Sequence, residues 1–334
     1  MSGTKLVMGA SGFLGSHVTR QLVERGDQVR VWIRESSSTA AFDDLDVERH
    51  VGELGDADAM RTAMKGVDTV FYCIVDARAW LRDPAPLFAT NVEGLRHALD
   101  VAVDVGVAKF VFCSTVGTIA IADSGAADES MPHNWRHRGG AYIESRIQAE
   151  DLVLQYHRAH GLPAVVLNVG TTYGPRDHGL TPHGRLVRAA ARGKMAAYVK
   201  GASVEVVGIE DAAAAFLLAE ERGVPGERYI VSESYLSLKD LYGLAADEGG
   251  AAAPKVAIPF PAMRLIGAVG GGVSRVLRKD SVVSPSSVRL MRMTSPLDHG
   301  KATRELGWQP SPVADSVRAA VRWYLDEGPR SRTQ

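Results

Sequence analysis

Short apolar runs alternate with helical patterns over the first half of the chain. The apolar runs resemble buried strands and lie at residues 5–8, 28–33, 47–51, 69–75, 109–113 and 164–169. Between them, apolar positions spaced three and four residues apart predict helices, chiefly at residues 11–25, 56–65, 89–105 and 142–160. Strands that alternate with helices form βαβ units, so the pattern predicts an α/β fold whose parallel sheet is covered on both faces.

The rhythm changes after Tyr173-Gly174-Pro175, where turn residues become frequent and apolar runs become shorter. We therefore expect a smaller lobe to follow the sheet. Within it, residues 256–277 form an apolar stretch, but Pro259, Pro261, Arg264 and Arg275 interrupt it. We interpret this stretch as an amphipathic helix with a proline-bounded entry, since a membrane span needs about 18 or more uninterrupted apolar residues.

Composition and charge exclude several classes of protein. The 334 residues include 38 Lys and Arg against 39 Asp and Glu, so the formal net charge is −1. A chain this neutral has no overall field that attracts nucleic acid or acidic lipid, and we expect neither nucleic acid nor a membrane as a partner. The two cysteines, Cys73 and Cys113, are too few for a disulfide framework. The N-terminus lacks the pattern of a signal peptide, so the expected location is cytoplasmic.

A glycine-rich turn after the first apolar run indicates dinucleotide binding. The residues Gly9-Ala10-Ser11-Gly12-Phe13-Leu14-Gly15 have the spacing G-x-x-G-x-x-G, between a predicted strand and a predicted helix. The first glycine permits a tight turn, the second lets the backbone approach a pyrophosphate, and the third lets helix and strand pack closely. The free N–H groups of the helix N-terminus then attract the phosphates.

The end of the second predicted strand bears on the choice of cofactor. An acidic residue there accepts hydrogen bonds from the 2′-hydroxyl of NAD, whereas a basic residue suits the extra phosphate of NADP. Arg34 stands near this position and Ser36-Ser37-Ser38 follow, although Glu35 could point to the same pocket. We expect NADP, with NAD as the second choice.

Several further motifs resemble those of the extended short-chain dehydrogenases/reductases, the NAD-dependent epimerase/dehydratase superfamily. The similarity is strongest to the branch of dihydroflavonol reductases and 3β-hydroxysteroid dehydrogenases. The motifs, in chain order, are Gly9-x-x-Gly12-x-x-Gly15, Gly52-Glu53-Leu54, Asn91-Val92-Glu93-Gly94, Ser114-Thr115, Tyr142 with Arg146, Tyr173-Gly174-Pro175 and Glu305-Leu306-Gly307-Trp308. The resemblance covers nearly the whole chain.

The resemblance implies a Rossmann-type, doubly wound sheet of seven parallel strands with a smaller substrate-capping lobe. It places the dinucleotide-binding domain at residues 1–175, with a later contribution from about 203–232. The substrate lobe would comprise residues 176–202 and 233–327, and residues 328–334 a frayed tail. It further implies a homodimer that packs through the helices at 89–105 and 142–160.

The resemblance also implies hydride transfer between a nicotinamide and a carbinol or carbonyl carbon. The candidate catalytic residues are Tyr142, Thr115, Arg146 and Ser114. The candidate cofactor-binding residues are Gly9, Ser11, Gly12, Phe13, Leu14, Gly15, Arg34, Glu53, Leu54, Ile74, Tyr142, Arg146, Asn168, Val169 and Thr171. No spacing of cysteines and histidines indicates a metal site.

Tyr142 is the candidate acid, because a developing alkoxide needs a proton donor within about 3 Å. Residues four apart share a helix face, so Arg146 should lie beside Tyr142 and lower its pKa. Arg146 replaces the lysine of the family. Either it supports a working site with altered pH behaviour, which we favour, or the enzyme is weakened. A literal Tyr-x-x-x-Lys at Tyr235 falls in the smaller lobe, so we expect no catalytic role there.

These observations leave three hypotheses for the function. The first is NADPH-dependent reduction of an aldehyde or ketone, or the reverse oxidation. The second is a nucleotide-sugar epimerase or dehydratase that uses bound NAD, and the third is a catalytically weak dinucleotide-binding regulator. The segments expected to contact the substrate, at residues 119–140, 176–198 and 259–277, contain few clustered charges. This composition favours a mostly apolar or aromatic small-molecule carbonyl or alcohol.

Overall fold

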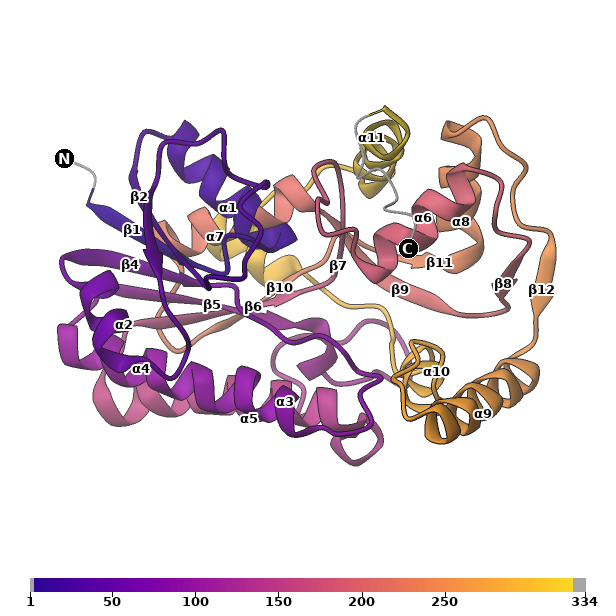
Figure 1. Ribbon diagram of the computed structural model, residues 1–334, viewed down its shortest axis with the longest axis horizontal. Helices are drawn as coiled ribbons and strands as arrows, with labels where there is room; N and C mark the ends of the chain where they lie inside the picture. Colours follow the sequence, from indigo (N-terminus) through magenta and orange to yellow (C-terminus); the bar gives the residue numbers. More distant parts are fainter. Residues whose placement is uncertain (1–2, 327–334) are drawn as a thin grey trace.

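The computed structural model describes residues 3–326, which form two connected regions (Figure 1). The strands are β1 (Thr4–Met8), β2 (Gln28–Ile33), β3 (Glu48–Val51), β4 (Val67–Tyr72), β5 (Lys109–Thr115), β6 (Ala164–Val169), β7 (Thr171–Tyr173), β8 (Ala197–Val199), β9 (Ser203–Gly208), β10 (Arg228–Val231), β11 (Ser234–Ser237) and β12 (Val256–Ile258). The α-helices are α1 (Phe13–Glu24), α2 (Ala57–Met64), α3 (Ala85–Phe88), α4 (Gly94–Val105), α5 (Gly140–His160), α6 (Pro182–Ala191), α7 (Ile209–Arg222), α8 (Leu238–Glu248), α9 (Phe260–Leu277), α10 (Pro285–Leu290) and α11 (Val313–Asp326). The tail expected at 328–334 lies outside the described residues.

The seven-stranded sheet confirms the predicted fold class. Its strand order is β10-β6-β5-β4-β1-β2-β3, and every neighbouring pair is parallel. The chain leaves β1 toward one edge and returns through β4 toward the other. Beside β1 the strand order therefore reverses, and a crevice opens at the carboxyl ends of the strands, where doubly wound sheets bind ligands.

Helices cover both faces of this sheet, as the near-continuous apolar strands require. One hydrophobic core joins the sheet to α2, α4 and α5, and the other joins it to α1 and α7. Figure 1 shows these two sets of helices on opposite sides of the strands. Because both layers are packed, the strand ends that face the crevice are held in fixed positions.

The second region is formed mainly by the chain after Pro175, together with β7. Strands β11, β9 and β7 form a three-stranded sheet, which packs with α6, α8 and α11 around a third core. The pair β12–β8 adjoins α9 and α10. Of residues 203–232, β10 joins the large sheet and α7 covers its face, whereas β9 pairs with β7 and β11.

Several element boundaries differ from the sequence prediction, and two of these differences concern the crevice. The fourth strand ends at Tyr72 and not at Val75, so the chain leaves the sheet earlier and forms a loop over the crevice. The helix predicted over residues 89–105 begins earlier, because α3 (Ala85–Phe88) runs directly into a π-helical turn, Ala89–Glu93, which α4 follows from Gly94. Single π turns are often found beside functional sites.

Candidate active site

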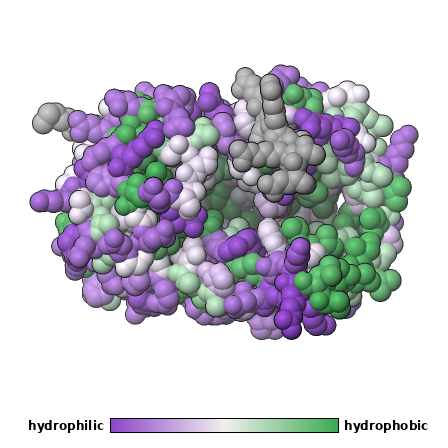
Figure 2. Space-filling model, viewed as in Figure 1, coloured by the Kyte–Doolittle hydropathy of each residue, from purple (hydrophilic) through white to green (hydrophobic). Residues whose placement is uncertain are grey.

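A cavity of about 1060 Å³ lies at the carboxyl ends of the large sheet, between the sheet and the second region. Figure 2 shows the surface hollowed at this place. It is lined by all but one of the predicted site residues: Gly9, Ser11, Gly12, Phe13, Leu14, Gly15, Arg34, Glu53, Leu54, Ile74, Ser114, Thr115, Tyr142, Arg146, Val169 and Thr171. The exception is Asn168.

The glycine turn forms a close-fitting cradle at one end of the cavity. Gly9 has a φ of 94°, and a Cβ at this position would lie 3.0 Å from the Cys73 carbonyl carbon. A Cβ on Gly15 would lie 2.2 Å from the Gly9 carbonyl oxygen. Gly12 is the N-cap of α1, and no side chain caps the helix there. The backbone N–H groups of this helix start are therefore available to a pyrophosphate, which fits the predicted dinucleotide site.

Arg34 lies at the same end, beyond β2. Its side chain is exposed and lines the cavity, and it forms no ion pair with any residue between 3 and 326. Ser37 also lines the cavity, and its hydroxyl accepts a hydrogen bond of 3.1 Å from the Arg34 backbone N–H. Glu35 is not among the lining residues. The polar groups that reach this part of the cavity from the turn after β2 are thus a cation and a hydroxyl.

Tyr142 and Thr115 meet at the other end of the cavity. Tyr142 lies in the first turn of α5 and Thr115 is the last residue of β5, and both side chains line the cavity close to each other. Burial raises the pKa of the Tyr142 hydroxyl, while the charge of Arg146 and the nearby Thr115 hydroxyl oppose this rise. The predicted lowering of this pKa is therefore wrong, because desolvation outweighs the cation. The hydroxyl remains protonated at neutral pH.

Arg146 lies one turn beyond Tyr142 and is buried. Its Nη2 donates to the Cys113 carbonyl, and its guanidinium carbon stands 5.2 Å from the centre of the Phe112 ring. Its Nε and Nη1 have no hydrogen-bond partner in the described part of the chain. A buried guanidinium with two unpaired N–H groups is costly unless a ligand completes it. Arg146 thus fits a group rich in hydroxyl acceptors, such as the ribose of a dinucleotide.

A buried carboxylate network, missed by the sequence analysis, lies behind the catalytic pair. The Glu150 Oε2 atom accepts hydrogen bonds from the side chains of Ser114 at 2.5 Å, Thr118 at 2.7 Å and Asn168 at 2.8 Å. Its Oε1 accepts from Arg228 at 2.9 Å. Glu150 could have been found from the sequence, since it follows Arg146 by four residues on the same helix face.

This network engages two of the predicted site residues. Ser114 lines the cavity, and its hydroxyl donates to Glu150, so it supports the end of β5. Asn168 was expected to bind cofactor, yet its side chain is buried and donates to Glu150, Thr118 and the Thr115 carbonyl. Both residues tie the ends of β5 and β6 to α5, and thereby hold Thr115 beside Tyr142.

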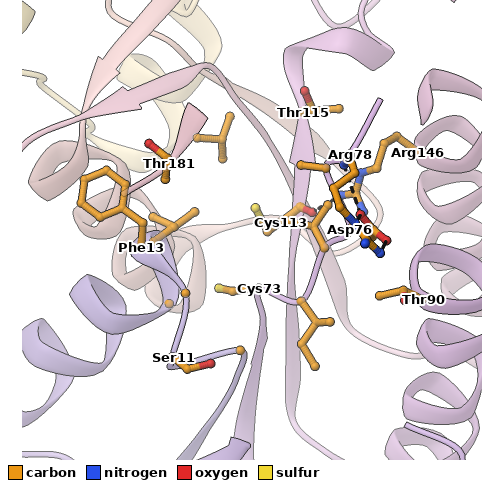
Figure 3. Close-up of a pocket in the computed structure, with 18 of the residues that line it drawn as sticks. Ser11, Phe13, Cys73, Asp76, Arg78, Thr90, Cys113, Thr115, Arg146 and Thr181 are labelled. Atoms are coloured by element: carbon orange, nitrogen blue, oxygen red, sulfur yellow. Dashed lines mark hydrogen bonds and ion pairs between the residues drawn. The ribbon is translucent and has the colours of Figure 1, made fainter. Parts of the chain in front are cut away.

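The loop that follows β4 covers the cavity beside Arg146. In Figure 3, Asp76 and Arg78 lie on the Arg146 side of the cavity, away from Phe13 and Thr181. Arg78 donates two hydrogen bonds to the Asp76 carboxylate, of 2.8 Å and 2.5 Å, and this partner lowers the Asp76 pKa despite its burial. Asn91, in the π turn, donates to the Asp76 carbonyl and accepts from its N–H. These hydrogen bonds hold the loop after Tyr72 in place along this side of the cavity.

The second region contributes uncharged groups to the cavity. Its lining residues there are Thr171, Thr172, Thr181, Pro182 and His183, and none of them is an Asp, Glu, Lys or Arg. Tyr235, of the second Tyr-x-x-x-Lys, belongs to β11 and lies outside the cavity lining, as expected. Ser237 caps α8, where its side chain accepts from the Asp240 N–H.

A buried histidine joins the region of the large sheet, which contains the glycine turn, to the second region. His17, on α1, makes a 3.1 Å hydrogen bond with the Pro175 carbonyl, in the predicted turn between the two regions. Burial lowers its pKa from 6.5 to about 4, so the ring is neutral at physiological pH and donates from Nε2. The sequence offered no signal for this residue, since its partner is 158 positions away.

Comparisons with known proteins agree with this arrangement. A family model described as the NAD dependent epimerase/dehydratase family matches residues 5–232. The chain is 31% identical to sterol demethylase protein B of Methylococcus capsulatus over 97% of this chain and 99% of the relative. It is 30% identical to a Synechocystis protein provisionally named a dihydroflavonol 4-reductase, over 98% of this chain and 96% of that protein. The crystal structure of gox2253 superposes with a TM-score of 0.86 at 34% identity, covering 97% of this chain and 98% of the other.

Proposed function

The chain belongs to the NAD-dependent epimerase/dehydratase family of extended short-chain dehydrogenases/reductases, and from that membership we propose that it reduces a carbonyl to an alcohol with NADPH, or catalyses the reverse oxidation. The observation that carries the proposal is that the Tyr142 and Thr115 side chains lie together in the cavity that also contains the glycine turn. An acid and a hydrogen-bond donor at one point are what a developing alkoxide requires.

The roles of the protein groups follow from this geometry. A bound nicotinamide cofactor supplies the hydride. Tyr142, which is protonated at neutral pH, gives its proton to the substrate oxygen in the reductive direction. Thr115 donates a hydrogen bond to the same oxygen, and the positive charge of Arg146 stabilises the phenolate that remains. Arginine does not lose its own proton, so Arg146 acts by charge and hydrogen bonding and does not relay protons.

The preference for NADP rests on the end of β2. Arg34 is exposed and forms no ion pair with another described residue, and Ser37 stands beside it at the cavity. Guanidinium groups bind phosphate through charge-assisted hydrogen bonds, whereas a 2′-hydroxyl is best held by a carboxylate. Glu35, the carboxylate in this turn, does not line the cavity. These positions support NADP over NAD.

The charge of the cavity favours a substrate without phosphates. A nucleotide sugar needs cations for its diphosphate, but no Lys or Arg of the second region lines the cavity. Near Tyr142, the guanidinium of Arg78 is already paired with Asp76. The nearby arginine Arg185 donates to the Leu180 carbonyl and does not line the cavity. We propose that the second region selects an uncharged, largely apolar carbonyl compound.

A substrate panel tests the proposal. The purified protein is given NADPH or NADH with apolar aldehydes and ketones, and separately NAD with UDP- and dTDP-sugars. We expect net oxidation of NADPH by at least one carbonyl compound, faster than that of NADH. Conversion of a sugar nucleotide without net change of the cofactor would instead establish an epimerase or dehydratase. Cofactor binding without turnover on either panel would establish a binding protein.

A further inference from the structure

The exposed face of α9 is the largest concentration of apolar surface in the described residues. Of the fourteen exposed large hydrophobic side chains there, eight lie between residues 265 and 283. They are Leu265 (67% exposed), Ile266 (44%), Val269 (59%), Val273 (51%), Val276 (82%), Leu277 (61%), Val282 (53%) and Val283 (39%). Figure 2 shows them as a continuous apolar area at the end of the molecule where Figure 1 places α9. We call these eight residues, six on α9 and two just beyond it, the α9 face.

The spacing of the six residues on α9 makes them a single stripe. At 100° per residue, the six exposed side chains between Leu265 and Leu277 fall within about one third of the helix circumference. A different side of the helix, with Met263, Gly267 and Ser274, is buried against the second region. The stripe therefore faces away from the protein, so packing within the chain does not account for its apolar character. Exposed apolar areas of this kind mark interaction sites.

The residues around the α9 face are strongly cationic, although the whole chain is close to neutral. Between residues 259 and 292 there are six Lys and Arg residues and a single Asp. The six cations are Arg264, Arg275, Arg278, Lys279, Arg289 and Arg292. The single acid, Asp280, accepts a hydrogen bond from the Arg82 backbone N–H, 3.0 Å away. The partner that covers the α9 face must therefore offer apolar and negatively charged groups together.

We propose that the α9 face binds the surface of an anionic lipid bilayer. An amphipathic helix lying in the interface buries its apolar stripe among the acyl chains, while flanking Lys and Arg side chains extend to the lipid phosphates. A second copy of this chain fits less well, because a twofold contact would bring two sets of six cations together. No helix of residues 3–326 is long and apolar enough to cross a membrane, so the contact is with one surface.

The position of α9 links this surface to the cavity. Asp280, just beyond the helix, accepts a hydrogen bond from the Arg82 backbone N–H. Its negative charge also helps to raise the pKa of Arg78, which lines the cavity. The bilayer contact would thus lie beside the loop that walls the cavity, where an apolar compound dissolved in the membrane could enter. This inference differs from the expectation of no membrane partner, which rested on charge averaged over the whole chain.

Vesicle flotation tests the proposal on the full chain, without cofactor or substrate, so its outcome is independent of the proposed activity. The probes are vesicles of phosphatidylcholine alone and of phosphatidylcholine with about 30% phosphatidylglycerol. We expect binding to the anionic vesicles at least about tenfold stronger than to the neutral ones, and loss of this preference in about 0.5 M NaCl. Absence of binding to both vesicles would overturn the proposal.

Two variants assign the binding to the α9 face. Val269→Glu/Val276→Glu places two carboxylates on the stripe and should weaken binding to the anionic vesicles by more than about tenfold. Val224→Glu alters a similarly exposed valine away from α9 and should bind as the wild type does. Thermal unfolding verifies that the variants fold. Equal binding by the double variant would refute the assignment. So would light scattering that shows a wild-type dimer, with the double variant monomeric.

Discussion

Replacing Glu150 by glutamine tests whether the buried network holds the site together. Glu150→Gln keeps the volume of the side chain and removes the charge that four donors share. The new amide oxygen can still accept from Ser114 and Asn168, but the amide nitrogen then faces Arg228, which stands 2.9 Å from Oε1. One charge-assisted bond is lost and two donors oppose each other, which should cost about 3 kcal/mol.

The assay is thermal unfolding of the wild type and of two variants at pH 7. For a chain of 334 residues the unfolding entropy is about 0.7 kcal/mol per kelvin, so about 3 kcal/mol lowers the Tm by about 4 °C. Glu144→Gln is the control, because this glutamate lies on the same helix and accepts from Arg136 at the surface. Exposed pairs contribute at most about 1 kcal/mol. A loss in Glu150→Gln no larger than in Glu144→Gln would refute the reasoning.

Two further predictions concern the region of the large sheet. Arg34→Ala should weaken NADPH binding by about tenfold and leave NADH binding within about twofold, because it removes one phosphate contact. Fluorescence titrations measure both affinities. Equal effects on the two cofactors would contradict the NADP assignment. His17 is neutral in the folded protein, with a pKa lowered from 6.5 to about 4, so acid protonates the unfolded chain first and stability is lost as pH falls through this window. His17→Gln should therefore lose about 2 kcal/mol less than the wild type between pH 7 and pH 5 in urea unfolding, and an unchanged difference would show that His17 is not the titrating group.

The sheet and the glycine turn were predictable because their signals are local. Apolar runs at β1, β2 and β6 are bounded by turn residues, and a buried parallel strand requires that continuous pattern. The roles of Gly9 and Gly15 depend on backbone approach within one βαβ unit, so the spacing alone located the cradle. The same holds for the pair of Tyr142 and Arg146, since a helix fixes which residues share a face.

The remaining features depend on contacts between distant parts of the chain. Glu150 meets Arg228 only because β10 returns to the edge of the sheet, 78 positions later. Asn168 was predicted to bind the cofactor because it lies near the end of β6, but its amide donates to the buried Glu150 carboxylate. The predicted lowering of the Tyr142 pKa was wrong because a sequence shows which charge is near but does not show how much water is excluded from the hydroxyl.

The central claim is that Tyr142 provides the proton for carbonyl reduction, and its hydroxyl can be removed alone. Tyr142→Phe retains the ring and removes the hydroxyl that lies beside Thr115. The decisive measurement is the kcat of this variant on the best carbonyl substrate of the panel, with the NADPH dissociation constant measured on the same preparation. We predict that kcat falls by about 10²–10⁴-fold while NADPH binding stays within about twofold. A kcat within about threefold of the wild type, at unchanged NADPH binding, would contradict the account.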